Sequence, residues 1–408
     1  MKEICPICGN KQIDSLIILE HIPYFDNCLC ESELHAVQAG CGTQNVVLCR
    51  RCGFNFNSAF DAANTEYGAG YHSERSGSLF YKRHLKNVAE HINSVSAIMG
   101  KRVLEVACGT GEFLKVVAAY NPQTCVGVDP SADATQGDIT FYRMLFDETY
   151  LAQHPDPADI LISRHMIEHI ENPLEVLRLF GKALSETGVL YLETPRLDWI
   201  LENHVFYDFC YEHCSYFTDK FIVRLLSAAG FSMIEIRPSY DGQYFSILAQ
   251  KTGAETEIAP ADEDELNRVE SAFKEIENAY LLARERFSSD RACADTDCKE
   301  APTLFDRPLT AGVYLWGASA KGVMCCNLLR GDWILGCIDK NPFKQGKFIP
   351  GTGHKVIAPA DITYEKVPYI LVENDVYLEE IEKEAHEIDT RIQVFSLNKL
   401  LGIGNQKG

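Results

Sequence analysis

Residues 103–114 read Val-Leu-Glu-Val-Ala-Cys-Gly-Thr-Gly-Glu-Phe-Leu: an apolar run, a turn on two glycines and the start of a helix. This order is typical of a nucleotide cradle, because glycines let a ligand approach the backbone and the first N–H groups of the helix face it. A second apolar run, residues 125–128, ends at Asp129, where a carboxylate can accept hydrogen bonds from both ribose hydroxyls. The turn lacks both the dinucleotide pattern G-x-G-x-x-G and a following phosphate-binding Lys, so the sequence favours a nucleoside without phosphates.

The composition limits the class of protein. With 408 residues the chain is too long for one hydrophobic core, so two or three domains are expected. The formal net charge of −20 argues against nucleic acid or an anionic membrane as a partner. No apolar run could span a bilayer, and the N-terminus lacks the apolar core of a signal peptide. We therefore expect a cytoplasmic protein whose 16 cysteines are reduced thiols.

Two Cys-x-x-Cys-Gly motifs mark the first segment. Cys5 and Cys8 form one pair, and Cys49 and Cys52 form the other. Each pair places two thiolates on a tight turn, so together they offer four soft ligands for a closed tetrahedral site. A redox role would need one pair in a thioredoxin-like setting, which is missing, so we predict a structural Zn²⁺ that takes no part in catalysis. Three further cysteines between the pairs lack this spacing: Cys28, Cys30 and Cys41.

Residues 64–82 are rich in Gly, Ser and Tyr and connect the cysteine segment to the glycine turn. Two interpretations stand side by side. One is a solvated linker, and the other is a polar lid over a binding site that carries Tyr71 and His72. Residues 81–99 alternate at helical period, which predicts a helix that covers the sheet.

Further strands are expected at residues 139–142, 158–163 and 188–193, with a closing hairpin at 231–236 and 244–250. The strand at 158–163 brings Arg164 and His165 to the carboxyl edge of the sheet, where open α/β folds bind ligands. Phe146 and Asp147 are candidates for packing against an adenine ring and bonding to its edge.

Residues 204–217 form an unusual insertion after the fifth strand, with His213 directly after Glu212. Histidine exchanges a proton near neutral pH, and a neighbouring carboxylate can set its tautomer or basicity. The alternative is an aromatic core loop with a satisfied histidine. Because the insertion follows a strand at the ligand edge, we favour catalysis.

The C-terminal part repeats the nucleotide pattern. After an acidic connector at 253–310 that contains an amphipathic helix at 263–287, residues 313–322 again read as strand, small-residue turn and helix. A further strand ends at Asp339, and Lys340, Lys344 and Lys347 follow it. The turn alone would suggest NAD, but the unit lacks a second mononucleotide half, so the lysines point to a diphosphate.

The glycine turn and the acid at the end of the next strand resemble the first motifs of the class I S-adenosylmethionine-dependent methyltransferases, with Ala107 at the place of the first motif glycine. The resemblance implies a doubly wound α/β sheet and S-adenosylmethionine as methyl donor. It implies that the donor is held by Glu105, Ala107, Cys108, Gly109, Gly111, Asp129, Arg164 and His165.

The chain as a whole resembles the three-domain C-methyltransferases that act on nucleoside-diphosphate 4-keto-deoxysugars. The resemblance implies a zinc-binding segment and lid at 1–80, a methyltransferase domain at 81–252, a helical connector at 253–310 and a Rossmann-like substrate domain at 311–408. It rests on the Cys pairs, residues 317–322, Asp339 with residues 350–353, and Asn374, which follows Glu373 where the family has an apolar residue. The substrate domain would bind the nucleotide through Gly317, Ser319, Lys321, Asp339 and Lys344.

The same resemblance implies the chemistry. The family segment Tyr-x-Glu-His is matched at Glu212 and His213, but Cys210 stands at the tyrosine position and a tyrosine lies beside it at Tyr211. His213 would remove the proton α to the ketone, and Tyr211 or Tyr71 would donate to the enolate oxygen. Two alternatives remain: an O- or N-methyltransferase for another small metabolite, and a non-catalytic zinc scaffold that binds a protein partner.

Overall fold

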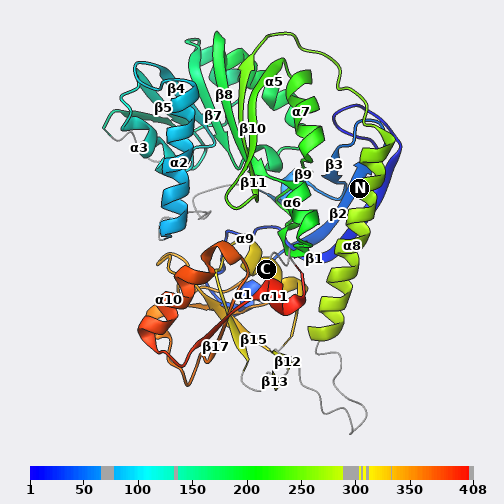
Figure 1. The fold of residues 1–408 in the computed structure, drawn as a ribbon, viewed down its shortest axis with the longest axis vertical. Coiled ribbons are helices and arrows are strands. Elements are labelled where there is room, and N and C mark those ends of the chain that lie inside the picture. Colours follow the sequence, from blue (N-terminus) through cyan, green and yellow to red (C-terminus); the bar gives the residue numbers. More distant parts are fainter. Residues whose placement is uncertain are drawn as a thin grey trace.

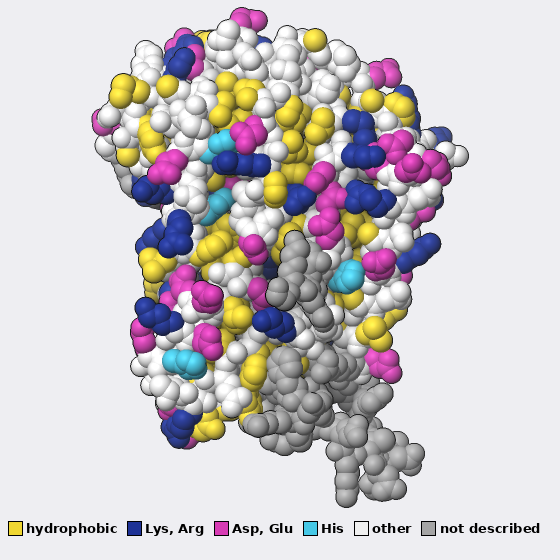
Figure 2. All heavy atoms as spheres, viewed as in Figure 1, with side chains coloured by type: hydrophobic (Ala, Val, Ile, Leu, Met, Phe, Trp, Pro, Cys, Tyr) yellow, Lys and Arg dark blue, Asp and Glu magenta, His cyan; other side chains and the backbone are white. Residues whose placement is uncertain are grey.

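The computed structural model describes residues 1–65, 78–132, 137–287, 303–304, 307–308, 312–331 and 333–403. Figure 1 shows two sheet-containing bodies stacked along the long axis, with helix α8 running down one side of the molecule. Side chains of both charges are interspersed over the face drawn in Figure 2. No helix among the described residues combines the length and the apolar character needed to cross a membrane.

A seven-stranded sheet forms the upper body in Figure 1. Its strands, in spatial order, are β10 (Phe231–Ser239), β11 (Tyr244–Lys251), β8 (Leu184–Pro195), β7 (Ala158–Arg164), β4 (Arg102–Val106), β5 (Thr124–Val128) and β6 (Ile139–Tyr142). β4 to β8 are parallel, whereas β11 runs antiparallel to both β8 and β10. The chain winds outward from β4 to β6 and then returns to β7 on the other side of β4. This doubly wound α/β sheet is the predicted fold class.

Helices cover both faces of this sheet because its strands are apolar on both sides. Val103 and Ile160 pack with the core under helix α2, whereas Leu104 and Leu161 pack with the core on the opposite face. The helices of this body are α2 (Leu79–Val95), α3 (Glu112–Ala118), α4 (Glu148–Gln153), α5 (Pro173–Ala183), α6 (Leu197–Glu202) and α7 (Asp219–Ala228). The predicted helix at 81–99 is therefore α2, which begins after the N-cap Ser78.

The N-terminal segment forms a four-stranded antiparallel sheet in the order β1 (Ile13–Pro23), β2 (Cys41–Cys49), β3 (Asn55–Asn57) and β9 (Ser215–Tyr216), with helix α1 (Glu33–Val37) between β1 and β2. Strand β9 belongs to the insertion at 204–217. This pairing was not predicted, and it fixes the insertion to the N-terminal sheet two residues after His213.

Helix α8 (Glu263–Phe287) leads to the lower body, where a short hairpin of β12 (Thr303–Leu304) and β13 (Arg307–Pro308) precedes a five-stranded parallel sheet. The sheet order is β16 (Lys355–Ile357), β15 (Ile334–Ile338), β14 (Val313–Trp316), β17 (Tyr369–Val372) and β18 (Gln393–Ser396). Its helices are α9 (Ala320–Leu328), α10 (Leu378–Ile388) and α11 (Leu397–Leu401). Short 3₁₀ helices complete the chain: η1 (Ala62–Asn64), η2 (Ile167–His169), η3 (Phe206–Asp208), η4 (Pro359–Asp361) and η5 (Asp375–Tyr377).

Both parallel sheets therefore reverse their winding direction at one place. In the upper sheet the reversal lies between β4 and β7, and in the lower sheet it lies between β14 and β17. Ligands of doubly wound folds bind at the carboxyl ends of the strands at this point.

Candidate active site

One cavity of about 1150 Å³ connects the two reversal points. The glycine turn after β4 and the residues after β7 line one part of it, and the turn after β14 and the residues after β17 line the other. The insertion contributes Glu212 and His213, and the N-terminal segment contributes Asp26 and Asn27. All three parts of the chain therefore meet around a volume large enough for two ligands.

The turn after β4 has the backbone of a glycine cradle. Ala107 has a φ of 59°, in the left-handed region that glycine adopts most easily, so it reproduces the local geometry of the motif glycine it replaces. Gly111 has a φ of 76°, and a side chain there would lie 2.3 Å from the ring of Phe141. Ala107, Cys108 and Gly109 line the cavity. Gly111 does not line it and is the N-cap residue of α3.

Two carboxylates face this cradle. Asp129 accepts from the N–H of Gly109 at 3.0 Å and from the N–H of Ser131 at 2.7 Å, so it ties the cradle to the end of β5. Glu105 is 2% exposed, and its Oε2 has no hydrogen-bond partner among the described residues. Burial raises the pKa of Glu105 to about 8, although the positive charge of Arg164 acts to lower it. A buried acceptor without a donor suits the ammonium group of S-adenosylmethionine, and the start of helix α3 and Asp129 suit its ribose, so these residues fit the methyl donor.

Arg164 and His165 belong to a buried polar network that the sequence did not predict. Its centre is Glu193 at the end of β8, which is fully buried and accepts two hydrogen bonds from Arg164, at 3.0 and 2.8 Å. His84 of α2 lies 2.8 Å from the other carboxylate oxygen, and His165 lies 3.2 Å from the oxygen that Arg164 binds. Both predicted residues line the cavity, but Arg164 is committed to Glu193, so its role is to hold the cavity wall.

Glu168, His169 and His213 form a second cluster, with their ligand atoms within 4.8 Å of one another. Such a group could hold a metal ion. However, Glu168 already accepts from the hydroxyl of Thr194 at 2.9 Å and pairs with His165 at 3.4 Å. We therefore interpret the cluster as one that handles a proton.

The charges of this cluster are set by burial and by its own members. Burial opposes ionisation of Glu168, but the hydrogen bond and the charge of His165 lower the pKa of Glu168 to about 2, so it is an anion. Burial and then His213 lower the pKa of His169 to about 4, so its ring is neutral. Nδ1 of His169 lies 3.1 Å from the carbonyl oxygen of Glu212. Because a carbonyl only accepts, Nδ1 carries the proton.

The structure separates the predicted catalytic residues. Glu212 and His213 line the cavity, but Tyr211 does not: it is buried in the core, and its hydroxyl accepts from the N–H of Asp61 at 3.0 Å and from Asn64 at 3.3 Å. The prediction that Tyr211 donates to a substrate oxygen is therefore wrong. Tyr71 lies outside the described residues, as does most of the predicted lid or linker at 64–82. Asp147 is also structural, because its carboxylate caps helix α4, while Phe146 lines the cavity.

The lower part of the cavity starts at Gly317, which has a φ of 132° and where a side chain would lie 2.4 Å from Glu373. Asp339 accepts from the N–H of Ala318 at 2.9 Å, as Asp129 does from Gly109 in the upper sheet. Gly317, Ser319, Lys321, Asp339 and Lys344, the residues expected to bind the nucleotide, all line the cavity.

The lysines of this part are already paired. Lys321 forms an ion pair with Asp208, and Lys340 lies 2.6 Å from Glu384. Lys344 donates to the carbonyl of Ala318 at 2.9 Å, and Lys347 pairs with Glu31 at 2.9 Å and does not line the cavity. The prediction that three lysines form one diphosphate site is therefore wrong for Lys347. The N-terminus of α9 and the two lysines nearest the turn, Lys321 and Lys344, remain the candidates for binding an anion.

The four predicted metal ligands lie together. The Sγ atoms of Cys5, Cys8, Cys49 and Cys52 are all within 4.8 Å of one another. The separation is 3.7 Å between Cys5 and Cys52 and 3.5 Å between Cys8 and Cys49. Four soft donors at this spacing fit a tetrahedral Zn²⁺.

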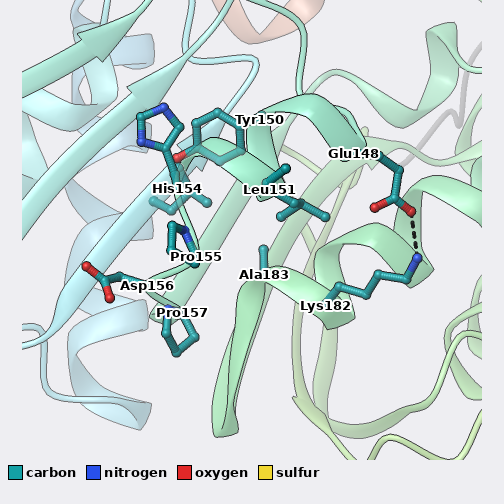
Figure 3. Close-up of a pocket in the computed structure, with 11 residues that line it drawn as sticks. Glu148, Tyr150, Leu151, His154, Pro155, Asp156, Pro157, Lys182 and Ala183 are labelled. Atoms are coloured by element: carbon teal, nitrogen blue, oxygen red, sulfur yellow. Dashed lines mark hydrogen bonds and ion pairs between the residues drawn. The ribbon is translucent and has the colours of Figure 1, made fainter.

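A smaller cavity of about 290 Å³ lies at the opposite edge of the upper sheet (Figure 3). His154, Asp156 and Pro157, just before β7, line it, and the ion pair of Lys182 with Glu148 stands at its side. Both members of this pair are largely exposed. This cavity is at the amino ends of the strands, away from both reversal points, so it is not where a doubly wound fold binds its ligand.

Comparisons with known proteins agree with this site. Residues 81–236 match the family model described as a methyltransferase domain, and residues 304–395 match the one described as a C-methyltransferase C-terminal domain. The chain is 25% identical over 384 residues to the C-methyltransferase NovU of Streptomyces niveus, which covers 90% of this chain and 88% of that protein.

Shorter similarities involve the upper body. The ubiquinone biosynthesis O-methyltransferase of Thiobacillus denitrificans is 26% identical over 112 residues, 25% of this chain and 48% of that protein. The solved magnesium protoporphyrin IX methyltransferase of Synechocystis PCC 6803 is 17% identical, with a TM-score of 0.34 over 42% of this chain and 84% of that one. The chain is a methyltransferase that uses S-adenosylmethionine: the match at 81–236 and the fit of the cradle to this donor agree.

Proposed function

We propose that the enzyme transfers the methyl group to a carbon atom next to a ketone, on a nucleoside-diphosphate keto-deoxysugar, and that His213 makes the carbon nucleophile. The observation that carries this proposal is the single cavity in which a methyl-donor cradle, a histidine of the insertion and a second nucleotide fold meet. The similarity to NovU along nearly the whole chain, which includes the C-terminal part, supports attack by carbon.

His213 is suited to take a proton from carbon. Its ring lies 5.0 Å from that of His169, edge to face, and the anion Glu168 is close to both. When His213 accepts the proton, Glu168 lies close to the imidazolium that forms. His169 stays neutral, so it does not oppose that charge.

The chemistry of the methyl donor needs little help, because its sulfonium already activates the methyl group. The residues of the chain therefore have two tasks: to hold both ligands in line and to stabilise the enolate. Glu105 and Asp129 would hold the donor, and the network around Glu193 would keep the wall between donor and substrate fixed.

The lower body would hold the nucleotide part of the substrate. The turn after β14 and the start of helix α9 supply N–H groups, with Ser319 and Lys321 at the first helical turn. We expect a nucleoside diphosphate to bind here more tightly than NAD, since the turn, Asp339 and the lysines suit one nucleotide. A titration that shows tight NAD binding would contradict this part of the proposal.

We further propose that the N-terminal cysteine cluster binds one structural Zn²⁺. The four sulfurs leave no position for a substrate, so the metal would stabilise the segment that carries Asp26.

The test uses the purified enzyme, S-adenosylmethionine labelled in its methyl group, and a panel of thymidine- and uridine-diphosphate 4-keto-6-deoxyhexoses. The product of the wild type should carry the label on carbon. With S-adenosylhomocysteine in place of the donor, the wild type should exchange the substrate's α-proton for deuterium from heavy water. His213→Asn should lose both activities by about 10²–10⁴-fold while it still binds the donor. Transfer to oxygen or nitrogen, without carbon-proton exchange, would reject the proposal.

A further inference from the structure

An enolate next to His213 needs a hydrogen-bond donor for its oxygen, and the expected tyrosine is not there. Tyr211 binds Asp61 and Asn64 with its hydroxyl, and Cys210, at the tyrosine position of the resembling family, does not line the cavity. The oxygen of an enolate is one carbon away from the carbon that loses its proton. Its donor must therefore lie beside the base.

Glu212 is the polar side chain best placed for this task. It lines the cavity directly before His213, is 1% exposed, and neither carboxyl oxygen accepts a hydrogen bond from an N–H or O–H donor of the described residues. Of the other buried acids of the upper body, Glu105 also has an oxygen without a partner among the described residues, but it faces the methyl-donor cradle. Glu193 binds Arg164 and His84, and Glu168 binds Thr194.

The neighbour of Glu212 is a second carboxyl, Asp26, in the loop between β1 and α1. Asp26 lines the same cavity, is 3% exposed and accepts from the side chain of Asn27 at 2.6 Å. Neither Asp26 nor Glu212 forms an ion pair with any described residue. Two ionised carboxylates are both acceptors, so a hydrogen bond between them requires that one carries a proton.

The other groups around Glu212 also favour its neutral form. The Cys28 thiol, like Asp26, raises the pKa of Glu212, and Asp26 and Glu212 in turn raise the pKa of the Cys210 thiol. Burial and then the charge of Asp26 raise the pKa of Glu212 well above its usual range. A buried carboxyl with an acidic neighbour and no cation stays protonated at neutral pH.

We propose that Glu212 acts as a neutral carboxylic acid that donates a hydrogen bond to the enolate oxygen, and that Asp26 of the N-terminal segment keeps the proton on it. In the resting enzyme the Glu212 proton lies toward Asp26. As negative charge grows on the ketone oxygen, that oxygen takes the place of Asp26 as acceptor. A carboxylic acid held neutral by its site is an established kind of enolate donor.

His213 takes the α-proton, and the electron pair of the broken C–H bond becomes the enolate, with its charge on the oxygen that Glu212 stabilises. The carbon then forms its new bond to the methyl group as the carbon–sulfur bond breaks and sulfur keeps that pair. His213 returns its proton to water. This inference rests on the proposed function, since it concerns the same enolate.

Substitutions separate this role from that of a carboxylate that orients His213. Glu212→Gln keeps a neutral donor, so α-proton exchange should fall by less than about tenfold, whereas Glu212→Met should lose about 10²–10³-fold, the usual effect of removing an oxyanion donor. If Glu212 worked as a carboxylate, the Gln variant would lose as much as the Met variant. That result would overturn the inference.

The pH profile gives an independent readout. The wild type should lose exchange as pH rises through the titration of Glu212. Asp26→Asn removes the charge that holds the proton, so this loss should move to lower pH. Glu31→Gln, in the same segment but exposed and paired with Lys347, is the matched control and should leave the profile unchanged. A loss on the acidic side that Asp26→Asn relieves would mean that the ionised form is active, which contradicts the inference.

Infrared difference spectra of the unliganded enzyme decide whether the acid is neutral without any substrate. The difference between the wild-type and Glu212→Gln spectra should show the carbonyl stretch of a protonated carboxyl group, whereas any bands of Glu105 and Glu373, which both proteins share, cancel. Absence of this band from the difference would overturn the inference even if carbon-proton exchange upholds the proposed function. Its presence without exchange or C-methylation would reject the proposed function, and with it the enolate role of Glu212.

Discussion

Replacing Arg164 by Met tests how far the wall of the active site depends on one buried cation. Arg164 is 8% exposed and donates to Glu193 Oε1 through Nε and Nη2, at 3.0 and 2.8 Å, and Glu193 is fully buried. Met fills most of the volume of the arginine's aliphatic stem. It leaves the Glu193 carboxylate with His84, His165 and Tyr191 as polar neighbours. Removing one partner of a buried pair costs about 3 to 5 kcal/mol, because the other charge stays buried. We expect a loss of that size in the free energy of unfolding.

Arg102 provides the matched control. It binds Asp159 through Nε and Nη2 at 3.2 and 3.0 Å, at the other end of the same sheet, but the two side chains are 32% and 24% exposed. Water can therefore replace the lost partner, and Arg102→Met should cost only about 1 kcal/mol. The comparison keeps the residue type, the number of hydrogen bonds and the sheet, and changes the burial.

The assay is urea unfolding of the full chain, followed by far-ultraviolet circular dichroism at pH 7 and at lower pH. Burial alone would raise the pKa of Glu193, but the charges of Arg164 and then His84 hold it well below its usual value. The stability that Glu193 contributes is therefore present at neutral pH and lost as pH falls through its folded pKa. In Arg164→Met that pKa is higher, so the loss should begin at a higher pH. Equal effects of the Arg164 and Arg102 substitutions would show that burial does not set the cost of losing the cation.

Three further predictions follow from the other parts of the site. Cys49→Ser should lower bound zinc from about one equivalent to near zero and reduce the yield of folded protein, as measured by elemental analysis of the purified chain. Asp129→Ala should weaken S-adenosylmethionine by about 2 kcal/mol in calorimetry, since charge-assisted ribose contacts are lost, and an unchanged affinity would place the ribose elsewhere. Burial raises the pKa of Glu373 to about 8, so Glu373→Gln should strengthen thymidine diphosphate binding at pH 9, where the wild-type carboxylate is ionised, but not at pH 6.5.

The backbone frame of the site could be predicted from the sequence because its signals are local. The apolar run before Ala107, the glycine turn and the acid at Asp129 each depend on neighbours within a few residues, and the structure has β4, α3 and β5 in those places. Ala107 has a φ of 59°, so the turn imposes a left-handed backbone even on a residue with a side chain. At this position the side chain only needs to be small enough for the space.

The catalytic side chains were harder to predict because their roles depend on contacts across the chain. Tyr211 and Glu212 are adjacent, yet one points into the core against Tyr24 and Phe60, and the other into the cavity. Asp26 belongs to a loop with no motif, and Glu193 reads as the end of an ordinary strand. Only tertiary contacts show what these residues do. The presence of Glu373 before Asn374 in place of an apolar residue was visible, but its position against Gly317 was not.

The pairing of β3 with β9 explains why a segment without catalytic chemistry of its own should affect the reaction. Asn55 pairs with Tyr216 and Phe56 with Ser215, so the N-terminal sheet holds the chain directly after His213. The same sheet begins with β1, which ends just before the loop of Asp26, and β2 ends at Cys49 in the cysteine cluster. A change at the cluster therefore reaches both members of the carboxyl pair, Asp26 through β1 and Glu212 through β9. Because the proposed pair works only if its two carboxyls stay in contact, we expect the cysteine cluster to stabilise the geometry on which the proton of Glu212 depends.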